Sequence, residues 1–359
     1  MEERLLFAPA SKQRFAAAGV RQTPGLTDLQ VNGYAGIDFN DSALTPAALD
    51  HALHAMLRAG VTTCLPTLIT ADEATLARRL AALDAAVRAT RLGPLMVPGF
   101  HLEGPFLNPM PGYAGCHPPA AMIDPNPTVL GRLTRHLQRP ILLLTVAPER
   151  HDALPLIIWA REHGMVVAMG HTAADAAVTR RAVEAGVTLS THLGNALPQP
   201  QPKFLNPLMA QLAHDGLHAS FIADGIHIPP DALKVLLRAK TLPWSVLVTD
   251  ATAAAAAPLG LYFFAGMTIQ HRPDGSVRIP GTATLAGSAL TLDQAVRNVV
   301  AWGLAEPDAA VAMASTQPGA LIAPALAWHR ITLSANTVTW TGDLHVAKVS
   351  VGDLEIVVA

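Results

Sequence analysis

Cysteine, charged and aromatic residues are all scarce in this chain of 359 residues. The two cysteines, Cys64 and Cys116, do not form a Cys-x-x-Cys pair, which argues against a disulfide framework or a thiolate zinc site and suits a reducing cytoplasm. Charged residues make up only 14%, and the formal net charge is -2. Because Lys and Arg are scattered rather than clustered, the charge gives no reason to expect a nucleic-acid partner.

Signals for export and membrane insertion are also missing from the sequence. The chain begins Met-Glu-Glu-Arg, which is acidic where a secretory signal would be basic, and no apolar signal core follows. We identify no apolar run close to the ~18–20 residues that a membrane-spanning helix needs. We therefore expect a cytoplasmic protein that binds neither membrane nor nucleic acid.

Short apolar runs recur at even spacing along the chain. Hydrophobic residues make up 50% of it, enough for a large buried core. The runs that we expect to be strands buried on both faces are 26–33, 62–69, 96–104, 141–149, 165–172, 189–195, 218–227 and 244–251. Segments with helical periodicity lie between them, most clearly 46–59, 71–90, 152–163, 174–185 and 230–240.

Alternation of strand and helix predicts parallel strands joined by right-handed crossovers. Eight such units predict a (β/α)8 TIM-type barrel, whose active site lies at the carboxyl ends of the strands. We assign residues 24–320 to the barrel, and 1–23 with 321–359 to a small β-domain built from the two chain ends. Within the barrel, residues 261–282 look like an inserted hairpin that turns at Pro273-Asp274-Gly275.

One carboxylate and two imidazoles follow three of the predicted strands. Glu103, His171 and His192 stand at the ends of the third, fifth and sixth runs. A lone His or Glu beside an apolar run is usually a hydrogen-bonded core or loop residue, but three at strand ends that meet at one barrel mouth are hard to explain in that way. These side chains suit Zn²⁺ or Fe²⁺. We therefore predict one divalent metal ion, with Zn²⁺ preferred and Fe²⁺ as the alternative.

Three protein ligands would leave room for water, which is the mark of a catalytic rather than a structural metal site. A bound metal lowers the pKa of water from ~15.7 towards ~7, so that a hydroxide can attack a carbonyl. Asp250 ends the eighth run and could take the proton of the water and pass it to a leaving amine. The competing interpretation of Asp250 alone is a helix cap.

Other polar residues surround the predicted ligands. His101 lies two residues before Glu103 on the same face of the strand, and we place it behind the ligands rather than among them. Gln30 and Asn32 in the first strand stand where many metal hydrolases have a His-x-His pair for a second metal. Because neutral amides are weak ligands, we expect one metal rather than two. The alternative is that both amides only fill the barrel mouth with hydrogen bonds.

Seven short motifs, in this order, resemble the N-acetylglucosamine-6-phosphate deacetylases of the amidohydrolase superfamily. They are His-Leu-Glu-Gly-Pro-Phe (101–106), Ala-Pro-Glu (147–149), Gly-His-Thr (170–172), Thr-His-Leu-Gly-Asn-Ala (191–196), Ile-Ala-Asp-Gly-Ile-His (222–227), Val-Thr-Asp-Ala (248–251) and Leu-Ala-Gly-Ser-Ala-Leu-Thr (285–291). The resemblance implies the same barrel and metal-dependent hydrolysis of N-acetylglucosamine 6-phosphate to glucosamine 6-phosphate and acetate.

The resemblance also implies roles for individual residues. Glu103, His171 and His192 match the metal ligands, and Asp250 matches the catalytic acid and base. His117 matches a histidine that contacts the acetyl carbonyl, with an ordinary loop histidine as the alternative. Asn195, Ala196 and His227 match groups that hold the sugar phosphate, and the segment around Ala286 and Gly287 matches a backbone contact to the substrate. Cys116 and Leu285 are further matched substrate contacts. In the family a partner subunit adds an arginine to the phosphate site, which implies a homodimer.

A short segment before Pro24 and a tail without the usual family ending imply that the small β-sandwich domain of the family is reduced here. Two further departures from the family pattern concern the substrate. Lys203 stands where the family has that arginine, and lysine lacks the planar fork that binds phosphate in a bidentate manner. Gly194 replaces an aromatic residue, which would open space near the substrate. We therefore keep a second hypothesis, in which the same chemistry acts on another N-acyl amino sugar or a small non-phosphorylated amide. A third, a barrel that only binds, is disfavoured because all three ligands and Asp250 are present.

Overall fold

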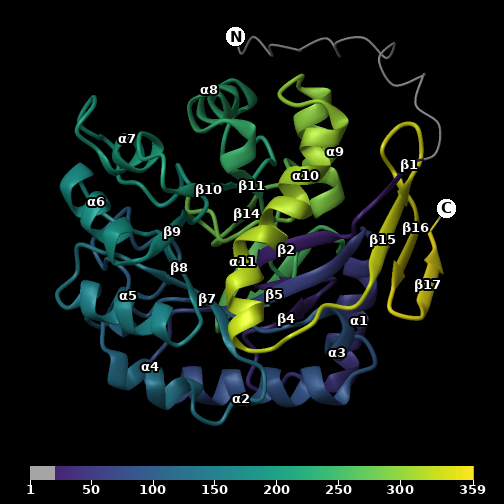
Figure 1. Ribbon diagram of the computed structural model, residues 1–359, viewed down its shortest axis with the longest axis horizontal. Helices are drawn as coiled ribbons and strands as arrows, with labels where there is room; N and C mark the ends of the chain where they lie inside the picture. The colour runs from purple at the N-terminus through teal and green to yellow at the C-terminus, as the bar shows by residue number, and fades with distance from the viewer. Residues whose placement is uncertain (1–20, 359) are drawn as a thin grey trace.

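The computed structural model describes residues 21–358. Most of the segment 1–23, which we assigned to the small domain, lies outside the described residues. The described chain is built around a parallel barrel, with helices on its outside and a small antiparallel sheet at one side (Figure 1).

Eight strands form the barrel, as the sequence predicted. They are β2 (Leu26–Val31), β5 (Val61–Ile69), β6 (Phe100–Glu103), β7 (Ile141–Val146), β8 (Val166–Met169), β9 (Val187–Ser190), β10 (His218–Phe221) and β11 (Ser245–Leu247). Each pairs in parallel with the next, in the order β2-β5-β6-β7-β8-β9-β10-β11. A parallel bridge between Val31 and Ala251 links the first strand to the segment after the last. This nearly closed ring confirms the predicted barrel.

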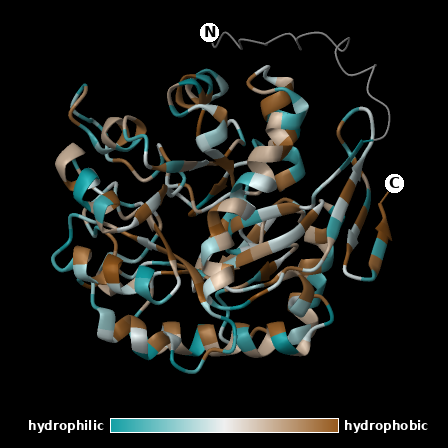
Figure 2. Ribbon diagram, in the orientation of Figure 1, coloured by the Kyte–Doolittle hydropathy of each residue, from teal (hydrophilic) through white to brown (hydrophobic). Residues whose placement is uncertain are grey.

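Helices surround these strands, and several begin at a polar residue whose side chain caps the first turn. They are α1 (Pro46–Arg58), α2 (Glu73–Ala89), α3 (Gly93–Met96), α4 (Pro127–Thr134), α5 (Ala153–Glu162), α6 (Ala176–Ala185), α7 (Pro207–Leu212), α8 (Pro230–Lys240) and α9 (Leu292–Ala301), with 3-10 turns at Pro119–Ala121 and Leu242–Trp244. The side chains of Thr45, Asp72 and Asp175 each accept a hydrogen bond from the first turn of a helix. Hydrophobic and hydrophilic residues alternate along the outer helices, so one side of each packs on the barrel (Figure 2).

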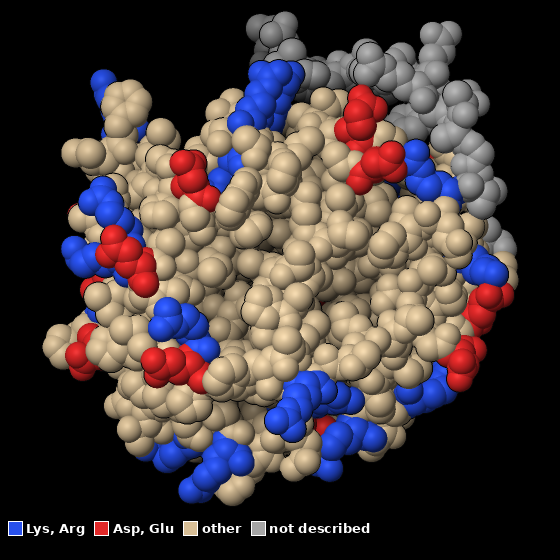
Figure 3. Space-filling view, viewed as in Figure 1, with Lys and Arg blue, Asp and Glu red and all other residues tan. Residues whose placement is uncertain are grey.

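Two further helices, α10 (Pro307–Ala314) and α11 (Thr316–Trp328), follow each other directly. By length and composition alone this 22-residue segment could cross a membrane, so the prediction that no run reaches that length is wrong here. In the fold, 56% of its most apolar window is buried. Helix α11 contacts β2 and β11 as well as β7 and β8, which lie across the barrel, so it covers one end of the ring. Figure 3 shows this face, with charged side chains gathered at its rim.

The small antiparallel sheet joins the two ends of the described chain. It contains β1 (Arg21–Thr23), β15 (Asn336–Trp340), β16 (Val346–Val351) and β17 (Leu354–Val357), in that order. The indole of Trp340 is fully buried and donates to the hydroxyl of Thr23 at 2.8 Å. Val338 and Val349 belong to the same hydrophobic core as the barrel, so the two parts pack together. The division of the chain at residues 23 and 320 stays a prediction.

The insertion after the eighth barrel strand is a three-stranded sheet. It contains β12 (Gly260–Phe264), β13 (Met267–His271) and β14 (Val277–Arg278), and a separate hairpin pairs β3 (Gly33–Tyr34) with β4 (Ile37–Asp38). The turn between β12 and β13 has positive φ at both central residues, 51° at Ala265 and 88° at Gly266, as a type I′ turn requires. The backbone N–H of Ala265 donates to the carboxylate of Asp38 at 2.7 Å, which fixes the insertion against the barrel.

Candidate active site

A cavity of about 460 Å³ lies where the barrel strands end. Its lining includes most of the residues that the sequence singled out, namely Asn32, Glu103, Cys116, His117, His171, His192, Asn195, Ala196, His227, Asp250, Leu285 and Gly287. Parallel topology explains this convergence, because residues just after each strand must meet at one mouth of the barrel.

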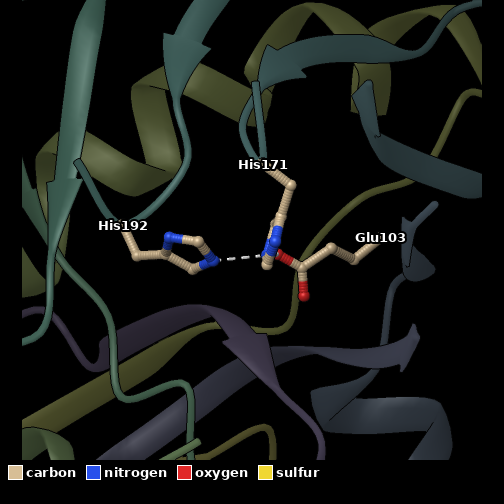
Figure 4. A group of neighbouring side chains, drawn as sticks. All are labelled: Glu103, His171 and His192. Atoms are coloured by element: carbon tan, nitrogen blue, oxygen red, sulfur yellow. Dashed lines mark hydrogen bonds and ion pairs between the residues drawn. The ribbon is translucent and has the colours of Figure 1, made fainter. Parts of the chain in front are cut away.

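Three of these side chains form a compact cluster suited to a metal ion (Figure 4). Oε1 of Glu103 lies 3.3 Å from Nε2 of His171 and 3.0 Å from Nε2 of His192. All three candidate ligand atoms lie within 4.8 Å of one another. Two atoms bound to one tetrahedral ion at about 2.1 Å would lie roughly 3.4 Å apart, so the spacing fits.

The orientation of the His171 imidazole also fits a metal. Nδ1 of His171 lies 2.7 Å from the carbonyl oxygen of Tyr113, which directs Nε2 toward the cluster. That Nε2 is buried and has no hydrogen-bond partner within residues 21–358. Because Nδ1 carries the proton, Nε2 of His171 presents a lone pair toward the carboxylate of Glu103 and the imidazole of His192. A cation between these groups would satisfy that buried lone pair. The pattern therefore fits one divalent ion held by Glu103, His171 and His192.

The backbone is strained where it presents these groups. His171, His192 and Asp250 have φ of 50°, 30° and 48°, in the left-handed region that non-glycine residues rarely adopt. Such strain costs roughly 1–3 kcal/mol per residue and gathers at functional sites. Three strained strand ends around one cavity therefore point to the same site as the side chains do.

Glu103 is ionised in this environment. Burial alone would raise its pKa, but contacts from His117, His171 and His192 hold the pKa well below its usual range. Nε2 of His117 lies 3.6 Å from the second oxygen, Oε2, and Nδ1 lies 3.0 Å from the hydroxyl of Thr70. Burial and then the neighbouring His171 lower the pKa of His117 to about 4. His117 is therefore a neutral imidazole beside the ligand cluster.

Asp250 is held by the two amides of the first strand. Its Oδ1 accepts from Nδ2 of Asn32 at 2.7 Å and from Nε2 of Gln30 at 3.2 Å. No side chain of the described segment donates to Oδ2, which leaves that oxygen available for a proton. Burial, followed by the negative charge of Glu103, raises the pKa of Asp250 to about 6. A carboxylate with such a pKa can take and return protons near neutral pH.

A second buried carboxylate, Asp28, lies beneath Asp250 and was missed by the sequence reasoning. Its Oδ2 accepts from the hydroxyl of Thr249 at 2.6 Å, and Oδ1 accepts from the backbone N–H groups of Gln30 and Thr249, both at 3.3 Å. Burial raises the pKa of Asp28 to about 7. Asp28 thus ties the first strand to the eighth, immediately before the residues that face the cavity. An acidic residue in an otherwise apolar strand was the available signal.

Four of the predicted site residues do not line the cavity. Gln30 donates to Asp250, which lines the cavity. His101 is fully buried between the hydroxyls of Thr67 and Thr145, at 3.2 and 2.8 Å. The other two are Ala286, which is buried with its backbone N–H donating to Val277, and Lys203, which is exposed on the loop before α7.

Gly194 does not enlarge the main cavity either. It lines a separate small hollow shared with Leu208 and Gln211, beneath the turn that carries Asn195. Its φ of 98° would strain any side chain placed there. The space that we expected near the substrate is therefore behind this turn.

Four apolar residues of the cavity wall were not predicted, namely Ile69, Leu197, Phe264 and Ala283. Ile69 ends β5, so its position at a strand end could have identified it. Phe264 comes from the inserted sheet, and strand periodicity gives no signal for where such an insertion folds.

Comparison with known proteins agrees with this geometry. No protein-family model matches the chain. The N-acetylglucosamine-6-phosphate deacetylase of Bacillus subtilis (strain 168) is 31% identical over 294 residues, which cover 81% of this chain and 72% of the relative. The N-acetylgalactosamine-6-phosphate deacetylase of Escherichia coli O157:H7 is 33% identical over 83% of this chain and 77% of the relative.

Among solved structures, a variant of the Mycobacterium smegmatis N-acetyl-D-glucosamine-6-phosphate deacetylase, in complex with N-acetyl-D-glucosamine-6-phosphate, is similar over 92% of this chain and 85% of its own, with a TM-score of 0.81 and 30% identity. Sequence and fold agree over most of both chains. The chain belongs to the N-acetylglucosamine-6-phosphate deacetylase family.

Proposed function

We propose that this protein hydrolyses the acetamido group of N-acetylglucosamine 6-phosphate to glucosamine 6-phosphate and acetate. The observation that carries the proposal is the convergence of Glu103, His171, His192 and Asp250 on one cavity. The family relation supports the substrate. We further propose a cytoplasmic location, which agrees with two cysteines that are both free.

The ligand set favours Zn²⁺, because one carboxylate and two imidazoles are typical of catalytic zinc sites and leave a position open. When bound there, such an ion would polarise the amide carbonyl and acidify water. Tyr113 orients His171 through its carbonyl oxygen, so the backbone sets the ligand geometry before any ion binds.

Asp250 moves the proton in the proposed reaction. Its free oxygen, Oδ2, takes the proton of the attacking water as the new C–O bond forms. It then gives that proton to the amide nitrogen, the C–N bond breaks, and the amine leaves; the acetic acid formed loses its remaining proton to solvent and departs as acetate. Asn32 and Gln30 hold Oδ1 throughout, so the carboxylate keeps its direction. His117 is placed beside Glu103, where it can donate a hydrogen bond to the acetyl carbonyl.

We propose that the sugar phosphate lies toward Asn195, Ala196 and His227. Nδ1 of His227 is 2.6 Å from the carboxylate of Asp224, which leaves its Nε2 for the ligand. Neither Lys nor Arg lines the cavity in the part of the chain that the structure describes. A doubly charged phosphate therefore needs a cation from elsewhere.

A homodimer would supply that cation. The loop before α7 projects from the body of the molecule (Figure 1). On it, Lys203 is exposed and is followed by Phe204 and Leu205, which are 73% and 91% exposed. Adjacent exposed apolar side chains mark a surface that can bind another chain. We propose that this loop reaches the phosphate site of the partner subunit.

The proposed reaction is tested with purified protein. Acetate release is measured with N-acetylglucosamine 6-phosphate, N-acetylgalactosamine 6-phosphate and unphosphorylated N-acetylglucosamine, before and after chelation and with Zn²⁺ or Fe²⁺ restored. We expect metal-dependent turnover of the glucosamine phosphate that disappears in Asp250→Asn. Preference for the unphosphorylated sugar would contradict the proposed substrate.

The homodimer is tested by mixing inactive chains. Asp250→Asn and Lys203→Ala are prepared separately, and light scattering gives the mass of each. A mixed dimer carries one site with an intact Asp250 and a partner that supplies Lys203, so mixing should restore part of the activity. A monomeric protein, or mixtures no more active than their parts, would refute the shared site.

A further inference from the structure

The cavity has two walls of different chemistry on opposite sides of the barrel. In the ring order β2-β5-β6-β7-β8-β9-β10-β11, strand β5 lies across from β9. Asn195 follows β9 and His227 follows β10, so this side carries an amide and an imidazole, beside the apolar Ala196 and Leu197. Ile69 ends β5 on the far side, where the wall is apolar.

Three more residues complete the apolar wall with Ile69, namely Cys116, Phe264 and Leu285. Ile69 and Phe264 are each only 1% exposed and share a separate hydrophobic cluster, against which Cys116 packs. This cluster lies outside the main barrel core and is built largely by the inserted sheet. The insertion therefore supplies one wall of the cavity.

The position of Phe264 is set by its hairpin. The next residue, Ala265, donates its N–H to Asp38, and the tight turn follows immediately. Because side chains alternate along a strand, Phe264 faces the cavity while Phe263 points to solvent and is 75% exposed. The phenyl ring is thus held rigidly at the end of the apolar wall.

The substrate has a matching polarity. The two substituents of a planar trans amide point away from each other across the C–N bond. If the sugar phosphate lies beside Asn195 and His227, the acyl chain must point to the opposite side. An acyl chain carries no hydrogen-bonding group beyond its carbonyl, so it is suited to a wall without polar side chains.

We propose that Ile69, Cys116, Phe264 and Leu285 form the acyl-binding wall, and that Phe264 sets the longest acyl chain that the enzyme accepts. This inference rests on the proposed deacetylation. One methylene in a hydrophobic pocket changes selectivity by roughly 10- to 200-fold. A chain that meets the phenyl ring should therefore lose at least about 10-fold in kcat/KM relative to acetyl.

The test compares N-formyl, N-acetyl, N-propionyl and N-butyryl glucosamine 6-phosphate as substrates. The wild type should prefer acetyl and decline steeply with longer chains. Phe264→Ala should raise the butyryl-to-acetyl ratio of kcat/KM by at least about 10-fold, and Phe264→Leu should give an intermediate value. The matched control Phe263→Ala, one residue away on the exposed face, should leave every ratio unchanged.

A second variant guards against loss of folding in Phe264→Ala. Cys116 is partly exposed on a loop. Cys116→Leu adds volume at the same wall and should lower the acetyl-to-formyl ratio of kcat/KM by at least about 10-fold. Ratios that stay constant in folded Phe264 and Cys116 variants would overturn the acyl wall while leaving deacetylation intact. A wild type that hydrolyses none of the four substrates would overturn the proposed function and this inference with it.

Discussion

Replacing Asn32 with leucine should weaken catalysis without unfolding the protein. Nδ2 of Asn32 donates to Oδ1 of Asp250 at 2.7 Å, the shorter of the two side-chain bonds that hold this carboxylate. The other amide atom, Oδ1 of Asn32, is buried and accepts no hydrogen bond from residues 21–358. Leucine has a volume similar to that of asparagine. The substitution removes the N–H donor to Asp250 together with an amide oxygen that has no partner, while Oδ1 of Asp250 keeps the bond from Gln30.

The size of the effect follows from the charge of the acceptor. A hydrogen bond to an ionised group contributes about 1.5–3 kcal/mol. If that energy keeps Asp250 in place in the transition state, kcat/KM should fall about 10- to 150-fold, with most of the loss in kcat. Gln30→Met removes the longer bond, at 3.2 Å, and should have a smaller effect.

The pH profile separates this role from a general loss of structure. The hydrogen bond from Asn32 lowers the pKa of Asp250, whereas burial and then Glu103 raise it to about 6. Asp250 must be ionised to accept a proton, so activity is lost as pH falls through this pKa. Without Asn32 the pKa is higher, and the acid limb should move to higher pH.

The assay measures kcat and KM from pH 5 to 9 for wild type, Asn32→Leu and Gln30→Met, with thermal unfolding as a check of folding. The reasoning would be refuted by a folded Asn32→Leu enzyme whose kcat/KM and acid limb both match those of the wild type.

Three further predictions test the metal ligands, the buried carboxylate and the backbone at the cavity. Glu103→Gln should lower the metal content, measured by plasma mass spectrometry, and should lower activity by more than about 100-fold. Groups that only support a metal ligand already contribute about 10- to 100-fold to metal affinity or activity. Full metal occupancy in this variant would contradict the assignment. The pKa of Asp28 is about 7 in the folded protein, against 3.8 for an ordinary aspartate. Between these pH values the folded state binds one proton more than the unfolded state. The free energy of unfolding of the wild type should therefore fall as pH rises through this window. Urea unfolding of Asp28→Asn should lack this fall, giving the variant an advantage of up to about 4 kcal/mol above pH 7; parallel pH curves for the two proteins would rule this out. A Cβ at Gly287 would lie 2.7 Å from the carbonyl oxygen of Asp250, so Gly287→Ala should lose both stability and kcat. Gly281→Ala is the control, because Gly281 has a similarly positive φ but no atom within 4 Å of the position that a Cβ would take. Equal losses in both variants would show that the contact with Asp250 is not the cause.

The barrel was predictable because each strand is a short, continuous apolar run. Helices starting at a polar cap, such as α1 after Thr45 and α2 after Asp72, were also predictable. The short helices α4 and α7 were not, since 8 and 6 residues show too little periodicity. The segment of α10 and α11 was missed for another reason. It is apolar on nearly all sides because it covers an end of the barrel.

The candidate metal cluster could be predicted for the same reason as the barrel. Glu103, His171 and His192 directly follow strands, so parallel topology alone brings them to one mouth. Gln30 and Asn32 were identified as polar residues of the first strand. Their contact with Asp250 became evident only when the ring closed and placed the first strand beside the eighth.

The amino-acid sequence by itself determined which residues follow the strands, and therefore the barrel, the candidate ligand set and the family. Tertiary structure alone decided that Asp28 lies beneath Asp250, that Lys203 is exposed and does not line the cavity of its own chain, and that Phe264 forms a wall of that cavity. The physical reason is the range of the interactions. Strand periodicity and parallel pairing repeat along the chain. Ring closure joins Asp28 to Thr249 across 221 positions, and the insertion joins Ala265 to Asp38 across 227, through contacts that no local pattern encodes.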